Sequence, residues 1–208
     1  MQIVYLYVFE TLSDWEPAYA IAGINNPAFQ KEPGRFCVKT VGVTADPVTT
    51  IGGLTILPGI TLDQVDPAHS AMLILPGGEG YDGGGHREAL QKAKEFLARD
   101  VPVAAICGAT AGMARAGMLD AVRHTSNAAV YLQMTGYHGA ALYQNEPAVT
   151  DGNVITAGAT APIAFAREIF KKLGLYSDDV LAAWFGLYTT GNPEYFFRLQ
   201  ELTAPPSE

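Results

Sequence analysis

The sequence predicts an α/β fold, in which a doubly wound and mostly parallel sheet carries helices on both faces. Short apolar runs of strand character alternate along the chain with longer segments of helical spacing, and this alternation is typical of parallel sheets. Hydrophobic residues make up 49% of the 208 residues, which is enough to bury both faces of such a sheet. Glycine or proline follows several of the apolar runs, as expected where a buried strand ends in a turn.

The first strand and the first helix are indicated by residues 2–24. Residues 2–9 are apolar and rich in β-branched and aromatic residues, which predicts a buried strand. Ser13 with Glu16 three residues later forms a capping-box pattern, so we expect a helix to begin there and to continue through residues 18–23. Two prolines within residues 25–34 then predict a surface loop.

Strands and helices continue to alternate after that loop. Gly52-Gly53, between two short strand-like runs, predicts a hairpin, and Gly174 is the expected stop of the last core helix. The remaining expected elements are strands at 36–43, 71–75, 101–106, 148–150 and 154–156, and helices at 87–99, 109–116, 127–134 and 163–173. This order favours a flavodoxin-like, doubly wound packing.

The composition argues against several classes of partner. The net charge is −8 and no block of Lys or Arg occurs, so we expect no nucleic-acid or anionic-membrane surface. No apolar run reaches the length of a membrane span, and the N-terminus does not have the pattern of a signal peptide. The two cysteines, Cys37 and Cys107, are expected to be reduced thiols. A cytoplasmic protein is therefore predicted.

Cys107 is the leading candidate for chemistry. It follows the apolar run 103–106 and precedes Gly108 and a stretch of small residues. This pattern predicts a sharp strand-to-helix turn, at the sheet edge where open α/β sheets bind ligands. The free N–H groups of the following helix are expected to favour the thiolate and to lower the thiol pKa. The alternative is an inert cysteine that closes a core strand.

Three further residues are expected to surround this thiol. Gly78, at the end of the Leu-Pro-Gly-Gly turn 75–78, and Gly108 offer backbone N–H groups for an oxyanion hole, although the same turn is also explained by tight backbone geometry alone. Glu16, in the first turn of the first helix, is expected at the same sheet edge. A carboxyl group beside a cysteine would titrate with it as a unit, whereas plain helix capping would explain Glu16 without chemistry.

The histidines are the remaining candidates. His124 and His138 are possible partners in a thiol–imidazole pair, whereas His69 and His86 lie in polar or glycine-rich turns and are expected to be exposed.

No metal-binding pattern occurs, and the glycine-rich run 77–85 lacks the Gly-Lys-Ser/Thr ending of a phosphate loop. No metal and no cofactor are predicted.

Together these features resemble the ThiJ/PfpI family, which shares the class I glutamine amidotransferase-like fold. The matching pieces are the first strand with Glu16 in the helix after it, LPGG at 75–78, AAICGATAGMARAGMLD at 104–120, and DGNVITAGATAPIAFAREIFKKLG at 151–174. The resemblance covers residues 1–175, so we interpret these as a ThiJ/PfpI-like domain. Residues 176–208 are expected to form a C-terminal helical extension. Its aromatic residues would dock on the core or serve a dimer contact.

The resemblance implies a role for each candidate residue. Cys107 looks like the nucleophile at an elbow, Glu16 like its carboxylic partner, and Gly78 with Gly108 like the oxyanion donors. Many members carry a histidine after the elbow helix. Here His124, our candidate for that role, falls one or two positions early, and Thr125 or Ser126 takes the usual place.

The implied function is a cysteine-dependent enzyme of the hydrolase, glyoxalase/deglycase-like or hydratase type, acting on a small carbonyl- or nitrile-like substrate. The alternatives are a non-catalytic redox-responsive or chaperone-like protein with an oxidisable cysteine, and an intracellular peptidase or amidase. Glutamine amidotransferase activity is not expected, because the sequence has no His-x-Glu pair in its C-terminal part. A homodimer is expected, mainly from the resemblance and the aromatic tail.

Overall fold

The computed structural model describes residues 1–204. Strands and helices alternate as predicted over most of this range. The strands are β1 (Gln2–Tyr7), β2 (Phe36–Gly42), β3 (Val48–Thr49), β4 (Thr55–Ile56), β5 (Ile60–Thr61), β6 (Ser70–Leu75), β7 (Val103–Ile106), β8 (Ala148–Asp151) and β9 (Val154–Ala157). The helices are α1 (Trp15–Asn25), α2 (Arg87–Ala98), α3 (Gly108–Arg115), α4 (Ala129–Gln133), α5 (Pro162–Leu173), α6 (Asp178–Thr190) and α7 (Pro193–Thr203).

A seven-stranded sheet forms the centre of the molecule, with the strand order β5-β2-β1-β6-β7-β9-β8. All neighbours pair in parallel except β8 and β9, which form an antiparallel hairpin. β3 and β4 form a separate two-stranded hairpin, as Gly52-Gly53 predicted. The predicted doubly wound, mostly parallel α/β fold is therefore confirmed.

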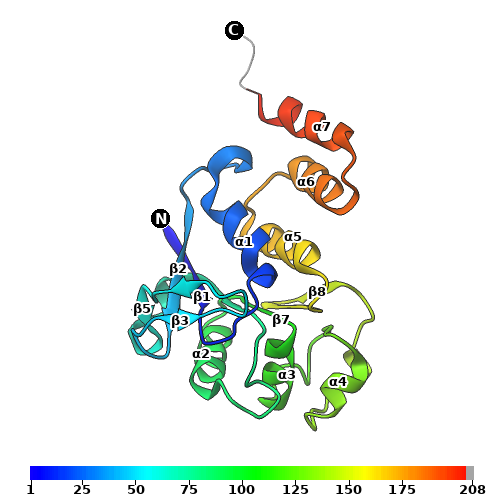
Figure 1. The fold of residues 1–208 in the computed structure, drawn as a ribbon. Helices are drawn as coiled ribbons and strands as arrows, with labels where there is room; N and C mark the ends of the chain where they lie inside the picture. Colours follow the sequence, from blue (N-terminus) through cyan, green and yellow to red (C-terminus); the bar gives the residue numbers. More distant parts are fainter. Residues whose placement is uncertain (205–208) are drawn as a thin grey trace.

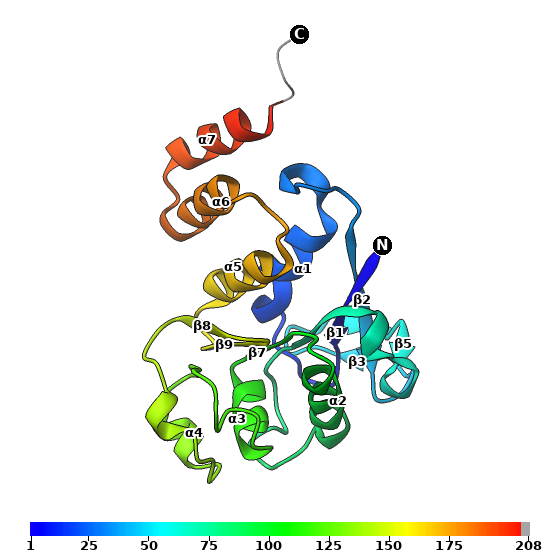
Figure 2. The ribbon, with the colours of Figure 1, turned by 180° about the vertical axis from the view of Figure 1, so that it is seen from behind.

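Helices cover both faces of this sheet (Figures 1 and 2). α1 and α5 lie on one face and contact each other, and α2 and α3 lie on the other face. The residues of β6 and β7 from Met72 to Leu75 and from Val103 to Ile106 are completely buried, as expected for strands with a helix layer on each side. The carboxyl ends of the central strands thus meet at one edge, between the two helix layers.

Two local features differ from what the sequence led us to expect. Ser13 does not cap α1: the residue at the cap is Asp14, which makes no side-chain capping bond. Ser13 is instead buried, and its N–H donates to the Gly77 carbonyl at 2.9 Å. The second miss is β5, which pairs with β2 through only two residues and is too short to leave a periodic pattern in the sequence.

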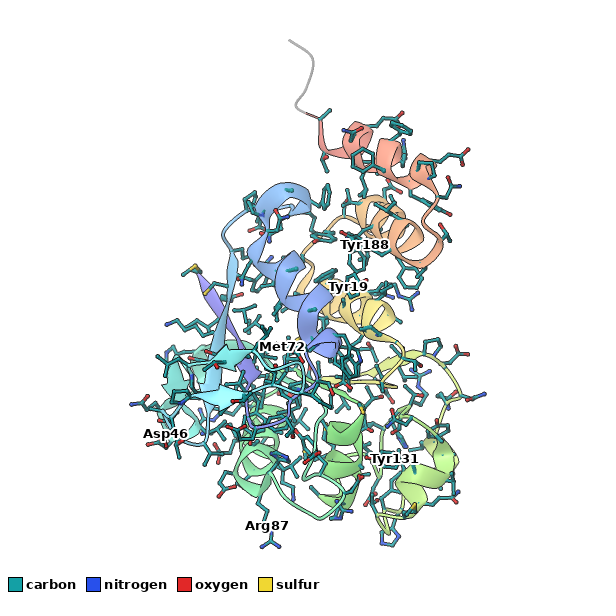
Figure 3. All side chains as sticks on the ribbon, in the orientation of Figure 1. Tyr19, Asp46, Met72, Arg87, Tyr131 and Tyr188 are labelled. Atoms are coloured by element: carbon teal, nitrogen blue, oxygen red, sulfur yellow. The ribbon has the colours of Figure 1, made fainter. Side chains whose placement is uncertain are left out.

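The C-terminal helices α6 and α7 lie outside α5, on the side away from the sheet (Figure 1). Trp184 of α6 is buried, with its ring 5.0 Å from that of Phe170 on α5. Tyr188, further along α6, lies 5.3 Å from Tyr19 of α1, and Figure 3 shows these two labelled rings on facing helices. α6 therefore docks through aromatic contacts, whereas Phe196 and Phe197 of α7 stay exposed.

Candidate functional site

Cys107 occupies a sharp turn between β7 and α3. Its backbone has φ 58° and ψ −125°, a combination that costs a non-glycine residue free energy. Its N–H donates to the carbonyl of Ala157 at 3.1 Å, so the turn is tied to the end of the neighbouring strand β9. The half-buried thiol is a free cysteine, and it stands at the N-terminus of α3 as the sequence predicted.

Glu16 reaches the same place from the first turn of α1. The residue is completely buried, and its Oε2 accepts a hydrogen bond of 2.5 Å from the Gly77 N–H. A Cβ added to Gly77 would lie 2.8 Å from that oxygen and 3.0 Å from the Cys107 Sγ. Carboxyl and thiol thus both lie against the position that a Gly77 side chain would take, where only glycine fits.

The Glu16 carboxylate disfavours the thiolate of Cys107, whereas the interaction with the protonated thiol lowers the pKa of Glu16. Burial raises the pKa of the Cys107 thiol to about 11, with a further increase from the Glu16 charge, although the amide of Asn127 and the N–H of Gly108 oppose this. Burial also raises the pKa of Glu16, while the Gly77 N–H lowers it. The predicted low pKa of the thiol is therefore wrong, because burial and the carboxylate outweigh the helix N-terminus. The pair retains a proton at neutral pH.

The two glycines expected to supply backbone N–H groups lie side by side near the thiol. The Gly78 carbonyl oxygen is 3.3 Å from where a Cβ on Gly108 would stand, and the Gly108 N–H faces the sulfur. Gly77, by contrast, donates its N–H to Glu16. Gly78 and Gly108 therefore remain the candidates for backbone N–H donors next to Cys107.

Asn127 is the site residue that the sequence analysis missed. Its Nδ2 donates to the Cys107 Sγ at 3.5 Å, and its Oδ1 accepts the Ala159 N–H at 2.8 Å. Asn127 is the first residue of the predicted helix 127–134, whereas α4 begins at Ala129, and no local pattern in the sequence connects Asn127 with Cys107. Neither Thr125 nor Ser126 contacts the sulfur: Ser126 bonds to Thr110, and Thr125 bonds to the Glu146 carbonyl.

The ring nitrogens of His124 form hydrogen bonds with groups other than the Cys107 thiol. The ring is completely buried, with Nδ1 2.7 Å from the Val122 carbonyl and Nε2 3.1 Å from the Tyr137 hydroxyl. Both nitrogens are thus engaged elsewhere, so the structure does not bring this predicted partner to Cys107. His138 donates its backbone N–H to Asp120.

The remaining histidines lie outside the sulfur's surroundings. His69 is exposed as expected and pairs with Asp66. His86, expected to be exposed, is instead half-buried in contact with the Tyr81 ring, and bonds to the Tyr7 hydroxyl and the Glu79 carbonyl. Within residues 1–204, no cluster of three His, Cys, Asp or Glu residues has the arrangement of a metal site.

Comparison with known proteins places this architecture in a family. A model of the DJ-1/PfpI family matches residues 2–172. The chain belongs to the DJ-1/PfpI family. The predicted ThiJ/PfpI resemblance is thereby confirmed.

Relatives within the DJ-1/PfpI family match over almost the whole chain. A Bacillus subtilis (strain 168) protein named uncharacterized protease YoaZ is 43% identical over 199 residues, which cover 94% of this chain and 95% of the relative. The crystal structure of a thiJ/pfpI family protein from Bacillus anthracis is 41% identical, with a TM-score of 0.92 over 99% of each chain. A DJ-1 superfamily protein from Agrobacterium tumefaciens is 31% identical, with a TM-score of 0.81 over 92% of this chain and 100% of that one.

Among residues 1–204, no helix is both long and apolar enough to cross a membrane.

Proposed function

We propose that this protein is a cysteine-dependent enzyme that acts on a small carbonyl compound, with Cys107 as the nucleophile. The observation that carries the proposal is a strained cysteine elbow beside a buried carboxyl group. Backbone strain of this kind is retained where function requires it, and the helix-capping explanation of Glu16 fails because the side chain bonds to Gly77 instead.

The proposed addition step uses the proton that Cys107 and Glu16 hold between them. The Cys107 sulfur attacks the carbonyl carbon, a C–S bond forms, and the C=O π electrons move to the oxygen. Glu16 takes the thiol proton as the sulfur attacks and then delivers it to the new alkoxide, so the product of the step is a neutral hemithioacetal. The N–H groups of Gly78 and Gly108 would hold the oxygen while it carries negative charge.

A second candidate is amide hydrolysis, which is favoured by the name of the Bacillus subtilis relative, an uncharacterized protease. An amide differs from an aldehyde in needing a proton on its leaving nitrogen before the C–N bond breaks. At this site that proton would also have to come from Glu16. Both candidates use the same nucleophile and the same proton carrier, and they differ in the substrate and in whether a leaving group departs.

A substrate panel tests the proposal and separates the two candidates. We would assay the wild type with methylglyoxal, with a fluorogenic peptide amide and with an alkyl isonitrile, and repeat the assays with Cys107→Ala and Cys37→Ser. Turnover of the aldehyde is expected to fall at least about 10³-fold in Cys107→Ala. Cys37→Ser should keep wild-type activity because Cys37 lies on β2, three strands away from β7.

The possible outcomes are distinct. Aldehyde turnover that needs Cys107 supports the proposal, and peptide cleavage that needs Cys107 would assign the protein to amide hydrolysis. Full aldehyde turnover by Cys107→Ala would overturn the role of the thiol.

A further inference from the structure

We propose that Asn127 is a catalytic residue of this site, whose amide contacts the thiolate in the position that a histidine occupies in a thiol–imidazole pair. This assignment rests on the function proposed above and specifies how the site carries its protons. Asn127 Nδ2, 3.5 Å from Sγ, donates a side-chain hydrogen bond to the sulfur.

The orientation of the amide is determined by its other end. The backbone N–H of Ala159 can only donate, so the Asn127 atom 2.8 Å away must be the oxygen. The nitrogen therefore faces the sulfur, and the alternative flip would place two donors against each other. Ala159 comes two residues after Ala157, the last residue of β9, whose carbonyl accepts the Cys107 N–H.

The segment that carries Asn127 is rigid. Thr125 N–H donates to Thr156 Oγ1 on β9 at 2.9 Å. Ser126 Oγ lies 2.6 Å from Thr110 Oγ1, and Thr110 donates in turn to the Cys107 carbonyl at 2.6 Å. Asn127 and Cys107 are thus held by one hydrogen-bonded network, which preorganises the amide against the sulfur.

An amide and an imidazole supply different chemistry at this position. Both donate a hydrogen bond to a thiolate, but the amide does not exchange protons at neutral pH. Among the described residues, Glu16 is then the one hydrogen-bond partner of the Cys107 thiol that can carry a proton. Addition to an aldehyde needs only one proton carrier, so the amide favours carbonyl chemistry over cleavage of a leaving amine.

Asn127 also faces the solvent side of the elbow, where a substrate would enter. It lines a groove of about 490 Å³ together with Glu146, Thr160 and Asn145. The Asn127 nitrogen carries two hydrogens, and Sγ accepts only one of them. The second is available to the oxygen of a substrate that extends from the sulfur into this groove.

The test uses the reactivity of the thiol, which needs no substrate. In the Cys37→Ser background, we would measure the rate of iodoacetamide alkylation against pH for Asn127, Asn127→Ala and Asn127→Asp. Loss of the donor in Asn127→Ala is expected to slow alkylation at pH 8 by about fivefold, because the thiol pKa rises. Asn127→Asp keeps an oxygen for Ala159 but adds an anion near the sulfur, and should slow alkylation at least as much.

Asn127→His supplies the second readout. It introduces an imidazole with a pKa near 6.5, so the pH dependence of aldehyde turnover should gain an inflection that the wild type lacks. Unchanged alkylation rates in both Asn127→Ala and Asn127→Asp would overturn the assignment. If the wild type turns over no aldehyde while alkylation still slows in the variants, the proposed function fails and the role of Asn127 stands.

Discussion

In the proposed mechanism, the chemistry of this site depends on the pair formed by Cys107 and Glu16. Each group lies in surroundings that disfavour its charge, so the two together keep one proton in the neutral range. A thiol with a raised pKa is unreactive until a base removes its proton. Glu16 is the group placed to do so, which makes the two residues a single functional unit.

Glu16→Gln separates the two effects of this carboxyl group. The Glu16 charge and its hydrogen bond raise the pKa of the Cys107 thiol, so the neutral amide should lower that pKa and speed alkylation by iodoacetamide at pH 8. Turnover should nevertheless fall about 10²-fold, because the proton carrier is lost. Alkylation kinetics and steady-state turnover on one preparation measure both.

Faster alkylation together with slower turnover in Glu16→Gln would show that Cys107 and Glu16 act as a pair. A parallel fall in alkylation and turnover would mean that Glu16 only supports the local fold. Circular dichroism of Glu16→Gln is the accompanying control, since glutamine can still accept the Gly77 N–H.

At the scale of elements, the site is made where β6, β7 and β9 end. Ile106 pairs with Ala157 and Leu75 pairs with Ala105, so the residues after these strands are brought to one edge. Close packing there leaves no room for a Cβ at Gly77 or Gly78 on the turn after β6.

Gly77→Ala tests that close packing. Its Cβ would lie 2.7 Å from the Cys107 Cβ and 2.8 Å from Glu16 Oε2, so we expect a loss of about 1–3 kcal/mol in the free energy of unfolding together with loss of turnover. Gly83→Ala is the matched control in the same glycine-rich run, because the nearest atom to its Cβ would be 3.7 Å away. Equal stability of the two variants in urea denaturation would refute this account of the turn.

Most helices and strands can be predicted from the sequence. The contacts between these elements can be predicted only in part. Apolar runs and glycine stops predicted the strands around Cys107, because burial on both sheet faces determines that pattern. The role of Asn127 was not predictable, because it depends on a loop whose position is set by hydrogen bonds to β9. Ser13 and Glu16 matched a capping pattern, but tertiary bonds to the turn at Gly77 replaced it.

At the scale of the molecule, the C-terminal helices extend the core on the side of α1 and α5. α6 buries Trp184 against Phe170, whereas α7 leaves its phenylalanines exposed. The division into a domain at 1–175 and an extension at 176–208 stays a prediction, as does the homodimer. The exposed aromatic residues of α7 are the surface that a dimer contact through the tail would use.

Trp184→Ala tests whether α6 is an integral part of the core. Trp184 is 4% exposed, so its removal should lower the free energy of unfolding by about 3–5 kcal/mol. Phe197→Ala, at a side chain that is 59% exposed, should leave stability nearly unchanged. Similar unfolding midpoints for Trp184→Ala and the wild type would show that α6 is an independent appendage.

Direct observation of the bond between Cys107 and a carbonyl carbon tests the whole account most directly. We would mix the Cys37→Ser protein with methylglyoxal labelled with ¹³C at the aldehyde carbon and record ¹³C NMR spectra. The account predicts a resonance from a tetrahedral carbon bonded to both sulfur and oxygen, which disappears when Cys107→Ala is added to the same background. Persistence of that resonance in the Cys107→Ala protein, or turnover without any dependence on Cys107, would contradict it.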